Sequence, residues 1–298
     1  MEYTEICNIC PRNCNINRSI NKGYCNTSLD VKVAKAFLHK WEEPFISGKN
    51  GSGTVFFTGC NLKCVFCQNY KISQLNYGKT LNTKELASLF ISLQNKGAHN
   101  INLVSPTIYI HQIKTAILLA REKGLSIPII YNTNAYENVK SLQALDGLIN
   151  IYLPDLKYYS NILSKKFSKA NDYFKHATQA ILEMYRQVGV PHFNHDGILE
   201  NGLVIRHLIL PGCIEDTKKI LLWIKNNLPK EIYISLMGQY TPFYKAKNYP
   251  ELNRTITQQE YEEAINYFFE IGLENGFVQE TTSASEKYIP EFDLEGLE

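Results

Sequence analysis

The sequence lacks the strong charge that would draw a polyanion to its surface. Its 31 lysine and arginine residues nearly balance its 29 aspartate and glutamate residues, and the formal net charge is only +2. A field this weak gives no reason to expect nucleic acid or an anionic membrane as a partner. Binding sites must therefore be sought in local motifs.

The sequence also lacks an apolar run long enough to span a bilayer, and it lacks a secretory signal. It begins Met-Glu-Tyr-Thr-Glu, without the basic start and apolar stretch of an exported protein. With 44% hydrophobic and 20% charged residues, its composition is that of an ordinary globular protein. We therefore expect a cytoplasmic protein with no membrane partner.

Cysteine, by contrast, occurs eight times. Seven of the eight form two groups near the N-terminus, which are Cys7, Cys10, Cys14 and Cys25, and then Cys60, Cys64 and Cys67. Cys213 stands alone, and we expect it to be a small packing residue. Because a reducing compartment disfavours disulfides, grouped cysteines predict metal or redox chemistry.

Apolar residues recur with alternating strand and helix periods from residue 51 onward. The expected strands cover residues 54–57, 101–104, 127–131, 149–153, 203–210 and 232–236, and the longer helices cover 110–123, 168–188 and 217–228. Capping boxes of Asn82 with Glu85, and of Thr257 with Glu260, predict the starts of two more helices. The alternation predicts an α/β fold with a parallel sheet, as in a barrel or a doubly wound sheet. Functional residues should lie at the carboxyl ends of the strands.

The second cysteine group follows the first of these strands. Three residues separate Cys60 from Cys64 and two separate Cys64 from Cys67, so one short loop can wrap three corners of a cubane. A fully ligated [4Fe-4S] cluster needs four thiolates, and three leave one iron open. An open iron can chelate S-adenosylmethionine, whose reductive cleavage gives methionine and a 5′-deoxyadenosyl radical. The alternative is that Cys64 and Cys67 are half of a structural zinc site.

The three-cysteine loop resembles the signature of the radical S-adenosylmethionine (radical SAM) superfamily. Four other strings resemble the uncharacterised radical enzymes related to pyruvate formate-lyase activating enzyme. They are Cys-Pro-Arg-Asn-Cys at 10–14, Trp-Glu-Glu-Pro at 41–44, Gly-Ser-Gly-Thr-Val-Phe-Phe at 51–57 and Arg-His-Leu-Ile-Leu-Pro-Gly at 206–212. The resemblance covers nearly the whole chain.

This resemblance implies a partial (β/α) barrel of six βα units over residues 51–245. A cysteine-rich metal-binding segment precedes it over 1–50, and a C-terminal helix and tail follow over 246–298. The implied cofactors are a [4Fe-4S] cluster and S-adenosylmethionine, and the implied partner is an electron donor such as flavodoxin or ferredoxin.

In the glycyl-radical activating enzymes, a Gly-Gly-Glu motif after the cluster loop binds the amino group of S-adenosylmethionine. Here the corresponding residues 104–107 read Val-Ser-Pro-Thr, without an acidic residue. By position, the resemblance makes Ser105 and Thr107 the expected cofactor contacts. The alternative is a strand-ending turn built around Pro106.

Residues 155–157 read Asp-Leu-Lys after the fourth strand, and this motif matches the activating enzymes more closely. The resemblance implies that Lys157 neutralises the cofactor carboxylate and that Asp155 orients it or accepts from a substrate backbone. A solvated ion pair at a strand end is the alternative. Arg206 resembles the family arginine that faces the cofactor. Gln239, with its neighbours after the sixth strand, is expected at the adenine end of the site.

The N-terminal group, Cys7, Cys10, Cys14 and Cys25, suits either tetrahedral zinc or an auxiliary [4Fe-4S] cluster. Spacing does not separate the two. We favour a closed structural site, because four protein thiolates leave no coordination position for a substrate. Free buried cysteines are the alternative.

The sequence thus predicts a radical SAM oxidoreductase that abstracts hydrogen, and the resemblance implies a glycyl radical protein as its substrate. The altered residues at 105–107 keep open a radical enzyme that acts on a small molecule or another macromolecule. A third reading, from a different class, is an iron-sulfur electron carrier or a zinc-stabilised binding module without turnover.

Overall fold

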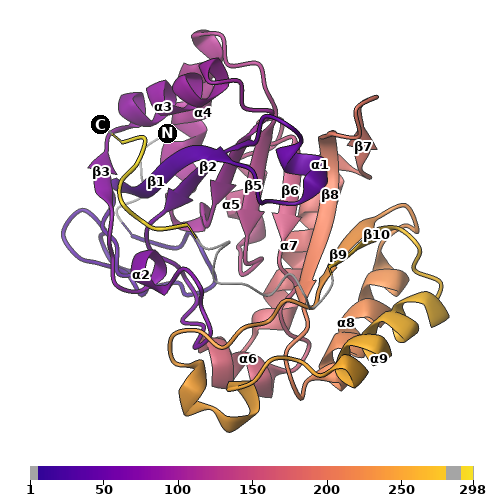
Figure 1. Cartoon of the computed structure of the whole chain (residues 1–298). Helices are drawn as coiled ribbons and strands as arrows, with labels where there is room; N and C mark the ends of the chain where they lie inside the picture. Colours follow the sequence, from indigo (N-terminus) through magenta and orange to yellow (C-terminus); the bar gives the residue numbers. More distant parts are fainter. Residues whose placement is uncertain (1–5, 280–289, 298) are drawn as a thin grey trace.

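A mostly parallel sheet forms the centre of the molecule (Figure 1). The computed structural model describes residues 6–279 and 290–297 of the 298-residue chain. The strand order is β10-β9-β8-β6-β5-β4-β2-β1-β3, and β7 pairs with β8 outside this path. The parallel strands are β2 (Ser52–Phe57), β4 (Ile101–Val104), β5 (Ile129–Thr133), β6 (Ile151–Pro154), β8 (Leu199–Leu208), β9 (Tyr233–Met237) and β10 (Gly276–Gln279).

Three antiparallel strands and a set of helices complete the fold. The antiparallel strands are β1 (Val31–His39), β3 (Lys79–Leu81) and β7 (His192–Phe193). The longer helices are α3 (Thr83–Asn95), α4 (Ile110–Glu122), α6 (Asn161–Ser168), α7 (Tyr173–Val188), α8 (Ile214–Asn227) and α9 (Gln258–Glu270), and the short ones are α1 (Pro44–Ser47), α2 (Tyr70–Ser73) and α5 (Val139–Gln143).

The sheet is buried on both of its faces. Leu103 and Ile205 belong to the large core that includes the buried side chains of α3, α4, α7 and α8. Alternate residues such as Ile130 and Val204 belong to a second cluster, which Phe45 from α1 joins. Successive strand residues point to opposite faces, so strands buried on both sides read as continuous apolar runs. This is the α/β architecture that the sequence predicted.

The helix starts follow the capping boxes seen in the sequence. The side chain of Asn82 accepts from the backbone N–H groups of Lys84 and Glu85, and the Glu85 carboxylate accepts from the backbone N–H of Asn82. Thr257 and Glu260 form the same reciprocal pair at α9. These two predictions are confirmed.

Several predicted elements differ from the observed ones. The long helix expected over 168–188 is two helices, α6 and α7. Lys169 lies between them in the left-handed region at φ 57°, which ends α6. The strands β1 and β10 were not predicted, because β1 carries lysines and β10 lies in a stretch read as leading into the tail. Residues 280–289 and 298 of that expected tail lie outside the described residues.

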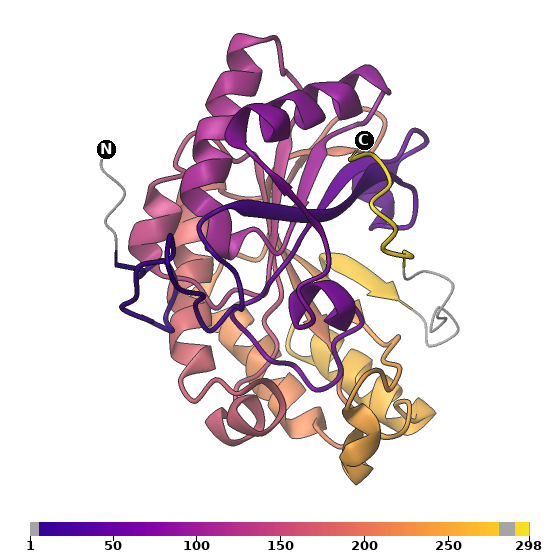
Figure 2. The same cartoon turned by 90° about the vertical axis from the view of Figure 1, so that its left-hand side faces the viewer.

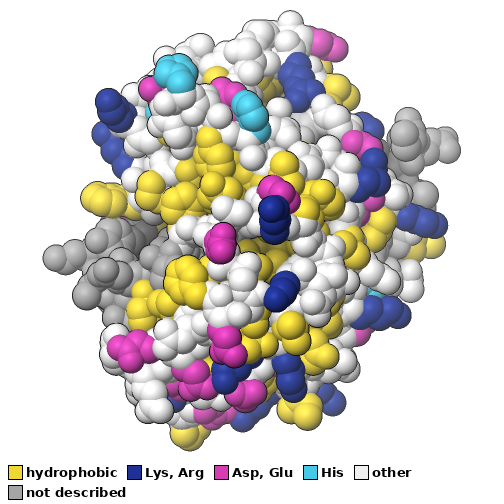
Figure 3. All heavy atoms as spheres, turned by 90° about the vertical axis from the view of Figure 1, so that its right-hand side faces the viewer, with side chains coloured by type: hydrophobic (Ala, Val, Ile, Leu, Met, Phe, Trp, Pro, Cys, Tyr) yellow, Lys and Arg dark blue, Asp and Glu magenta, His cyan; other side chains and the backbone are white. Residues whose placement is uncertain are grey.

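Charge on the surface of the molecule is mixed. Figure 3 shows basic and acidic side chains interspersed on one face of the molecule, as the small net charge leads one to expect. Within the described part of the chain, no helix combines the length and apolarity needed to cross a membrane.

The C-terminal segment, residues 290–297, docks on β1 (Figure 2). The Leu294 N–H donates to the Ala34 carbonyl at 3.2 Å. The buried ammonium of Lys35 lies 3.0 Å from Asp293 Oδ1, and Leu297 is buried in the main core. This segment therefore joins the fold through backbone, ionic and apolar contacts at once.

We expect Leu297→Ala to lower the free energy of unfolding by about 2 kcal/mol, because it removes a packed core side chain. Leu75→Ala, at a side chain that is 61% exposed, is the matched control and should change stability little. Denaturant unfolding measures both. Equal stability of the Leu297 variant and the wild type would show that the segment does not unfold with the rest.

Candidate functional site

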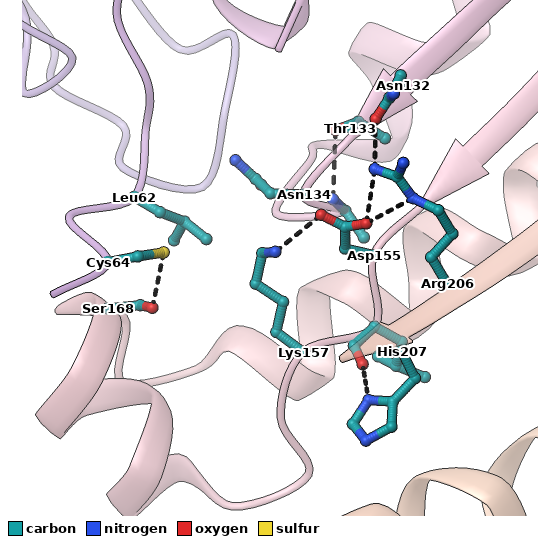
Figure 4. A network of polar contacts seen from close by, with 12 residues as sticks. Leu62, Cys64, Asn132, Thr133, Asn134, Asp155, Lys157, Ser168, Arg206 and His207 are labelled. Carbon is teal, nitrogen blue, oxygen red and sulfur yellow. Dashed lines mark hydrogen bonds and ion pairs between the residues drawn. The ribbon is translucent and has the colours of Figure 1, made fainter. Parts of the chain in front are cut away.

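The carboxyl ends of the parallel strands carry the polar residues of the site. The three-cysteine loop follows β2, Asn134 follows β5, and Asp155 directly follows β6. Arg206 lies within β8, where an isolated parallel bridge pairs it with Asp155. The parallel pairing thus brings residues far apart in sequence to one edge of the sheet (Figure 4).

Each sulfur of the three-cysteine loop has a polar neighbour. Asn134 Nδ2 donates to Cys60 Sγ at 3.3 Å, and Ser168 Oγ donates to Cys64 Sγ at 3.0 Å. Cys67 Sγ lies 3.3 Å from the hydroxyl of Ser73. Hydrogen-bond donors stabilise a thiolate and orient metal ligands. A donor set of three thiols supported in this way fits an iron-sulfur cluster.

Burial keeps these thiols protonated in the metal-free protein. It raises the pKa of Cys60 to about 11 and that of Cys67 to about 12, while Lys157 partly offsets the same rise in the pKa of Cys64. Metal binding would therefore release protons. In the described residues, no group of three or more His, Cys, Asp or Glu side chains has converged into a metal-holding arrangement. Ligation by these cysteines remains a prediction.

A buried chain of alternating charges lies beside the loop. Asp155 Oδ1 accepts from Arg206 Nε at 2.8 Å, and Asp155 Oδ2 accepts from Lys157 Nζ at 2.7 Å. Arg206 Nη2 donates to Asn132 Oδ1 at 2.6 Å, and its Nη1 lies 3.8 Å from Glu42 Oε2. The order of charges is Glu42, Arg206, Asp155 and Lys157, and Lys157 lies on the side toward Cys64 (Figure 4).

The charges in this chain stabilise one another. Burial opposes ionisation of Asp155, but Arg206 and Lys157 outweigh it and lower the carboxyl pKa. Burial also opposes the charge on Lys157, yet Asp155 and Cys64 raise its pKa. The pKa of Glu42 is raised, chiefly by burial. At neutral pH, Asp155 and Lys157 are therefore both ionised.

His207 points away from Arg206, as strand alternation predicts. Its Nδ1 lies 2.7 Å from the Leu156 carbonyl, and its Nε2 lies 2.9 Å from the Thr217 hydroxyl. Burial lowers its pKa to about 4, so the ring is neutral. It is a hydrogen-bonded core residue.

Three other predicted contacts lie at the same edge of the sheet. Ser105 follows β4 with φ 60°, and its N–H donates to the Asn132 carbonyl at 2.9 Å. Gln239 follows β9, and its Oε1 is buried without a hydrogen-bond partner among the described residues. Thr107 is buried, and its hydroxyl is engaged by Glu137, as described next.

Glu137 is a buried carboxylate that joins the loops after β4 and β5. Its Oε1 accepts from the hydroxyls of Thr107 at 2.6 Å, Thr133 at 2.5 Å and Tyr131 at 3.3 Å. Its Oε2 has no hydrogen-bond partner in the described part of the chain. Burial raises the pKa of Glu137 to about 7 despite the three hydroxyl donors.

Four residues of the site were not predicted from the sequence, and they are Glu42, Asn132, Asn134 and Ser168. Glu42 lies in the string Trp-Glu-Glu-Pro, which carried the resemblance but no assigned role. The two asparagines lie at the carboxyl end of β5, so their position was a usable signal. Ser168 offered none, because it reaches Cys64 only through the fold.

The N-terminal cysteines lie close to one another in a turn-rich segment. A Cβ on Gly23 would lie 3.3 Å from Cys25 Sγ and 3.6 Å from Cys14 Sγ, so these two sulfurs flank one glycine. The Tyr24 N–H donates to Cys14 Sγ at 3.4 Å. The electrostatic influence of Cys14 and Cys25 also reaches Cys7 and contributes to its raised pKa, which burial mainly causes.

Fold and site together define a parallel α/β protein with a three-cysteine loop at the carboxyl edge of its sheet. Residues 54–212 match the family model described as the radical SAM superfamily. The chain belongs to the radical SAM superfamily. Membership supports an enzymatic role and implies S-adenosylmethionine and a [4Fe-4S] cluster as cofactors.

Relatives with similar sequences come from Methanocaldococcus jannaschii. The uncharacterized protein MJ0674 is 34% identical over 270 residues, which cover 87% of this chain and 73% of that protein. The uncharacterized protein MJ0808 is 24% identical over 313 residues, which cover 93% of this chain and 83% of that protein.

Among solved structures, SuiB of Streptococcus suis bound to S-adenosylmethionine is similar, with a TM-score of 0.51 at 15% sequence identity. The match covers 76% of this chain and 52% of SuiB, so the chain spans about half the length of that protein. A likeness at this identity supports the fold alone.

The raised pKa of Glu137 predicts a pH dependence of stability. Its carboxyl has an ordinary pKa of 4.5 when unfolded and about 7 when folded, so the folded state binds the proton more tightly. The stability that this proton binding contributes is fully present below the unfolded pKa, and it is lost as the pH rises through the folded pKa. Relative to Glu137→Gln, the wild type should lose up to about 3 kcal/mol between about pH 5 and about pH 8.

Denaturant unfolding of both proteins at the two pH values measures this difference. The glutamine can keep an acceptor for the three hydroxyls but does not titrate in this range. Parallel pH profiles for the two proteins would contradict a buried, titrating Glu137.

Proposed function

We propose that this chain is a radical SAM enzyme that holds a [4Fe-4S] cluster on Cys60, Cys64 and Cys67. Such a cluster, reduced by a flavodoxin or ferredoxin, would supply the one electron needed to cleave S-adenosylmethionine to methionine and a 5′-deoxyadenosyl radical for hydrogen abstraction from the substrate. The proposal rests on the position of this loop directly after the first parallel strand, where each sulfur lies beside a polar group.

The buried charged residues beside the loop suit the amino and carboxylate groups of S-adenosylmethionine. Lys157 has three donors, and its contact with Asp155 uses one of them. Its ammonium can therefore also neutralise a carboxylate. Asp155 is ionised and can accept from an ammonium or a substrate N–H, and Arg206 fixes its orientation. Ser105 and Gln239 are proposed as further cofactor contacts, and Thr107 is proposed to hold the loop after β4 through its bond to Glu137.

For the substrate, we propose a glycyl radical protein from which hydrogen is abstracted at a glycine. The strings at residues 10–14, 41–44, 51–57 and 206–212 support this reading. The competing substrate class is a small molecule or another macromolecule. It is favoured by the strand end at 105–107, where no acidic residue is present and the Thr107 hydroxyl is engaged with Glu137.

For the N-terminal cysteines, we propose a closed structural site that holds zinc. Four thiolates satisfy tetrahedral zinc and leave no open position for a substrate. The position of Gly23 beside Cys14 Sγ and Cys25 Sγ supports a turn built around the sulfurs, since a side chain at that glycine would be tight against Cys25 Sγ and in contact with Cys14 Sγ.

Incubation of the anaerobically reconstituted protein with S-adenosylmethionine and dithionite should yield 5′-deoxyadenosine. Cys64→Ala should abolish this product, because only two loop thiolates would remain to hold the cluster. Cys213→Ala is the matched control, since Cys213 lies in neither cysteine group and should be dispensable. The electron-carrier and binding-module alternatives predict no product from the wild type, and equal yields from wild type and Cys64→Ala would reject the proposal.

The same assay distinguishes the substrate classes. A glycine-deuterated candidate protein should transfer its label into 5′-deoxyadenosine if the chain is a glycyl radical activating enzyme. Product that forms without label would favour the small-molecule or other macromolecular substrate.

Metal analysis of protein purified without oxygen tests the N-terminal site. We expect about one zinc beside about four irons per chain, and loss of the zinc alone in Cys10→Ala. A wild-type content of about eight irons without zinc would instead indicate a second [4Fe-4S] cluster.

A further inference from the structure

We propose that Arg12 is a positioning residue that joins the four-cysteine segment, residues 7–25, to the three-cysteine loop and fixes the backbone around Cys60 and Cys64. The proposal rests on the proposed function, because it assumes that these cysteines hold the cluster. It also gives a role to the string Cys-Pro-Arg-Asn-Cys, in which Arg12 stands between Cys10 and Cys14.

The guanidinium of Arg12 binds the backbone at two places near the cluster loop. Its Nε donates to the Asn61 carbonyl at 2.8 Å, and Asn61 directly follows Cys60. Its Nη1 donates to the Lys169 carbonyl at 2.5 Å. Lys169 directly follows Ser168, whose hydroxyl donates to Cys64 Sγ. One side chain thereby binds both the loop between the first two cysteines and the residue next to Ser168.

Asn61 is held from other directions as well. Its Nδ2 donates to the Tyr136 carbonyl at 2.6 Å, and its Oδ1 accepts from Asn134 Nδ2 at 2.9 Å. Asn134 Nδ2 is the same group that lies 3.3 Å from Cys60 Sγ. A shift of the Asn61 backbone would therefore also move the donor to the Cys60 sulfur.

Two aromatic rings fix the orientation of the guanidinium. Its central carbon lies 4.0 Å from the centroid of the Tyr24 ring and 5.2 Å from that of Tyr136. Tyr24 belongs to the four-cysteine segment, and its N–H donates to Cys14 Sγ. Arginine stacks on rings while its planar fork donates at the edge, and lysine cannot do both. The site thus requires the shape of arginine rather than its charge alone.

The four-cysteine segment has other anchors that do not involve Arg12. Arg18 Nη1 donates to the Ile108 carbonyl at 2.6 Å, and Ser141 Oγ donates to the Ile9 carbonyl at 2.7 Å. Asn138 Nδ2 donates to the Asn8 carbonyl at 2.8 Å. Loss of Arg12 should therefore leave the segment docked while it loosens the three-cysteine loop. A change at Cys10 or Cys14, such as loss of a bound metal, would reach that loop through the same side chain.

The test compares Arg12→Met and Arg12→Lys with the wild type. Arg121→Lys is the matched control, because Arg121 also donates to two backbone carbonyls, of Gly147 at 3.2 Å and Leu148 at 2.9 Å. Iodoacetamide labels the metal-free proteins, and mass spectrometry resolves the rate at each cysteine. Circular dichroism checks that each variant is folded.

We expect about tenfold faster alkylation of Cys60 and Cys64 in both Arg12 variants, because two hydrogen bonds that restrain their loop are lost. Cys213 should react at the wild-type rate in these variants, and all cysteines should do so in Arg121→Lys. In reconstituted protein, a chelator should remove iron about tenfold faster from the Arg12 variants than from the wild type.

Wild-type rates at Cys60 and Cys64 in Arg12→Met would overturn the proposal, and so would full recovery of those rates by lysine. A uniform rise that includes Cys213 would also overturn it, since that result indicates general unfolding. If the wild type itself takes up no iron on the three-cysteine loop, the proposed function fails instead. The alkylation rates still report on Arg12 in that case.

Discussion

The ion pairs of Asp155 with Arg206 and Lys157 are the interaction on which the arrangement of the site depends. They join the end of β6 to β8 and hold Lys157 beside Cys64. A buried carboxylate is stable only if its partners remain, because loss of either one leaves an uncompensated charge in a poorly solvated place. The pairing of β6 with β8 and the position of Lys157 therefore depend on the same carboxylate. Glu42, on the other side of Arg206, extends the alternation of charge by one residue.

The same edge of the sheet gathers segments from the whole length of the chain. Backbone groups in irregular loops need partners, and here the loops supply them to one another. Arg12 from the N-terminal segment binds the carbonyls of Asn61 and Lys169. At the other end of the chain, Phe292 packs edge-on against Phe56, with ring centroids 5.5 Å apart. Residues from both ends of the described sequence thus contact β2 or the cysteine loop that follows it.

The features that short stretches of sequence determine were predicted from the sequence. The six strands followed from apolar runs, two helix starts followed from capping boxes, and the cysteine loop followed from spacing alone. The break between α6 and α7 was not predicted, because Lys169 adopts a left-handed conformation that its residue type does not suggest. The strand β1 was not predicted because its buried Lys35 is compensated by Asp293, 258 residues away in sequence. Ser168 reaches Cys64 only through the fold, so no spacing rule could identify it, whereas Asn134 follows β5 at a strand end where functional residues are expected.

We propose that Cys60, Cys64 and Cys67 leave one iron of a [4Fe-4S] cluster open to S-adenosylmethionine. Electron paramagnetic resonance of the reduced, reconstituted protein tests this coordination, with the cofactor carrying nitrogen-15 in its amino group. Adding this cofactor should shift the g-values of the reduced cluster, and a hyperfine coupling to the labelled nitrogen should appear. A spectrum that is unchanged by the cofactor, without any coupling to the label, would show that the cofactor does not bind the cluster.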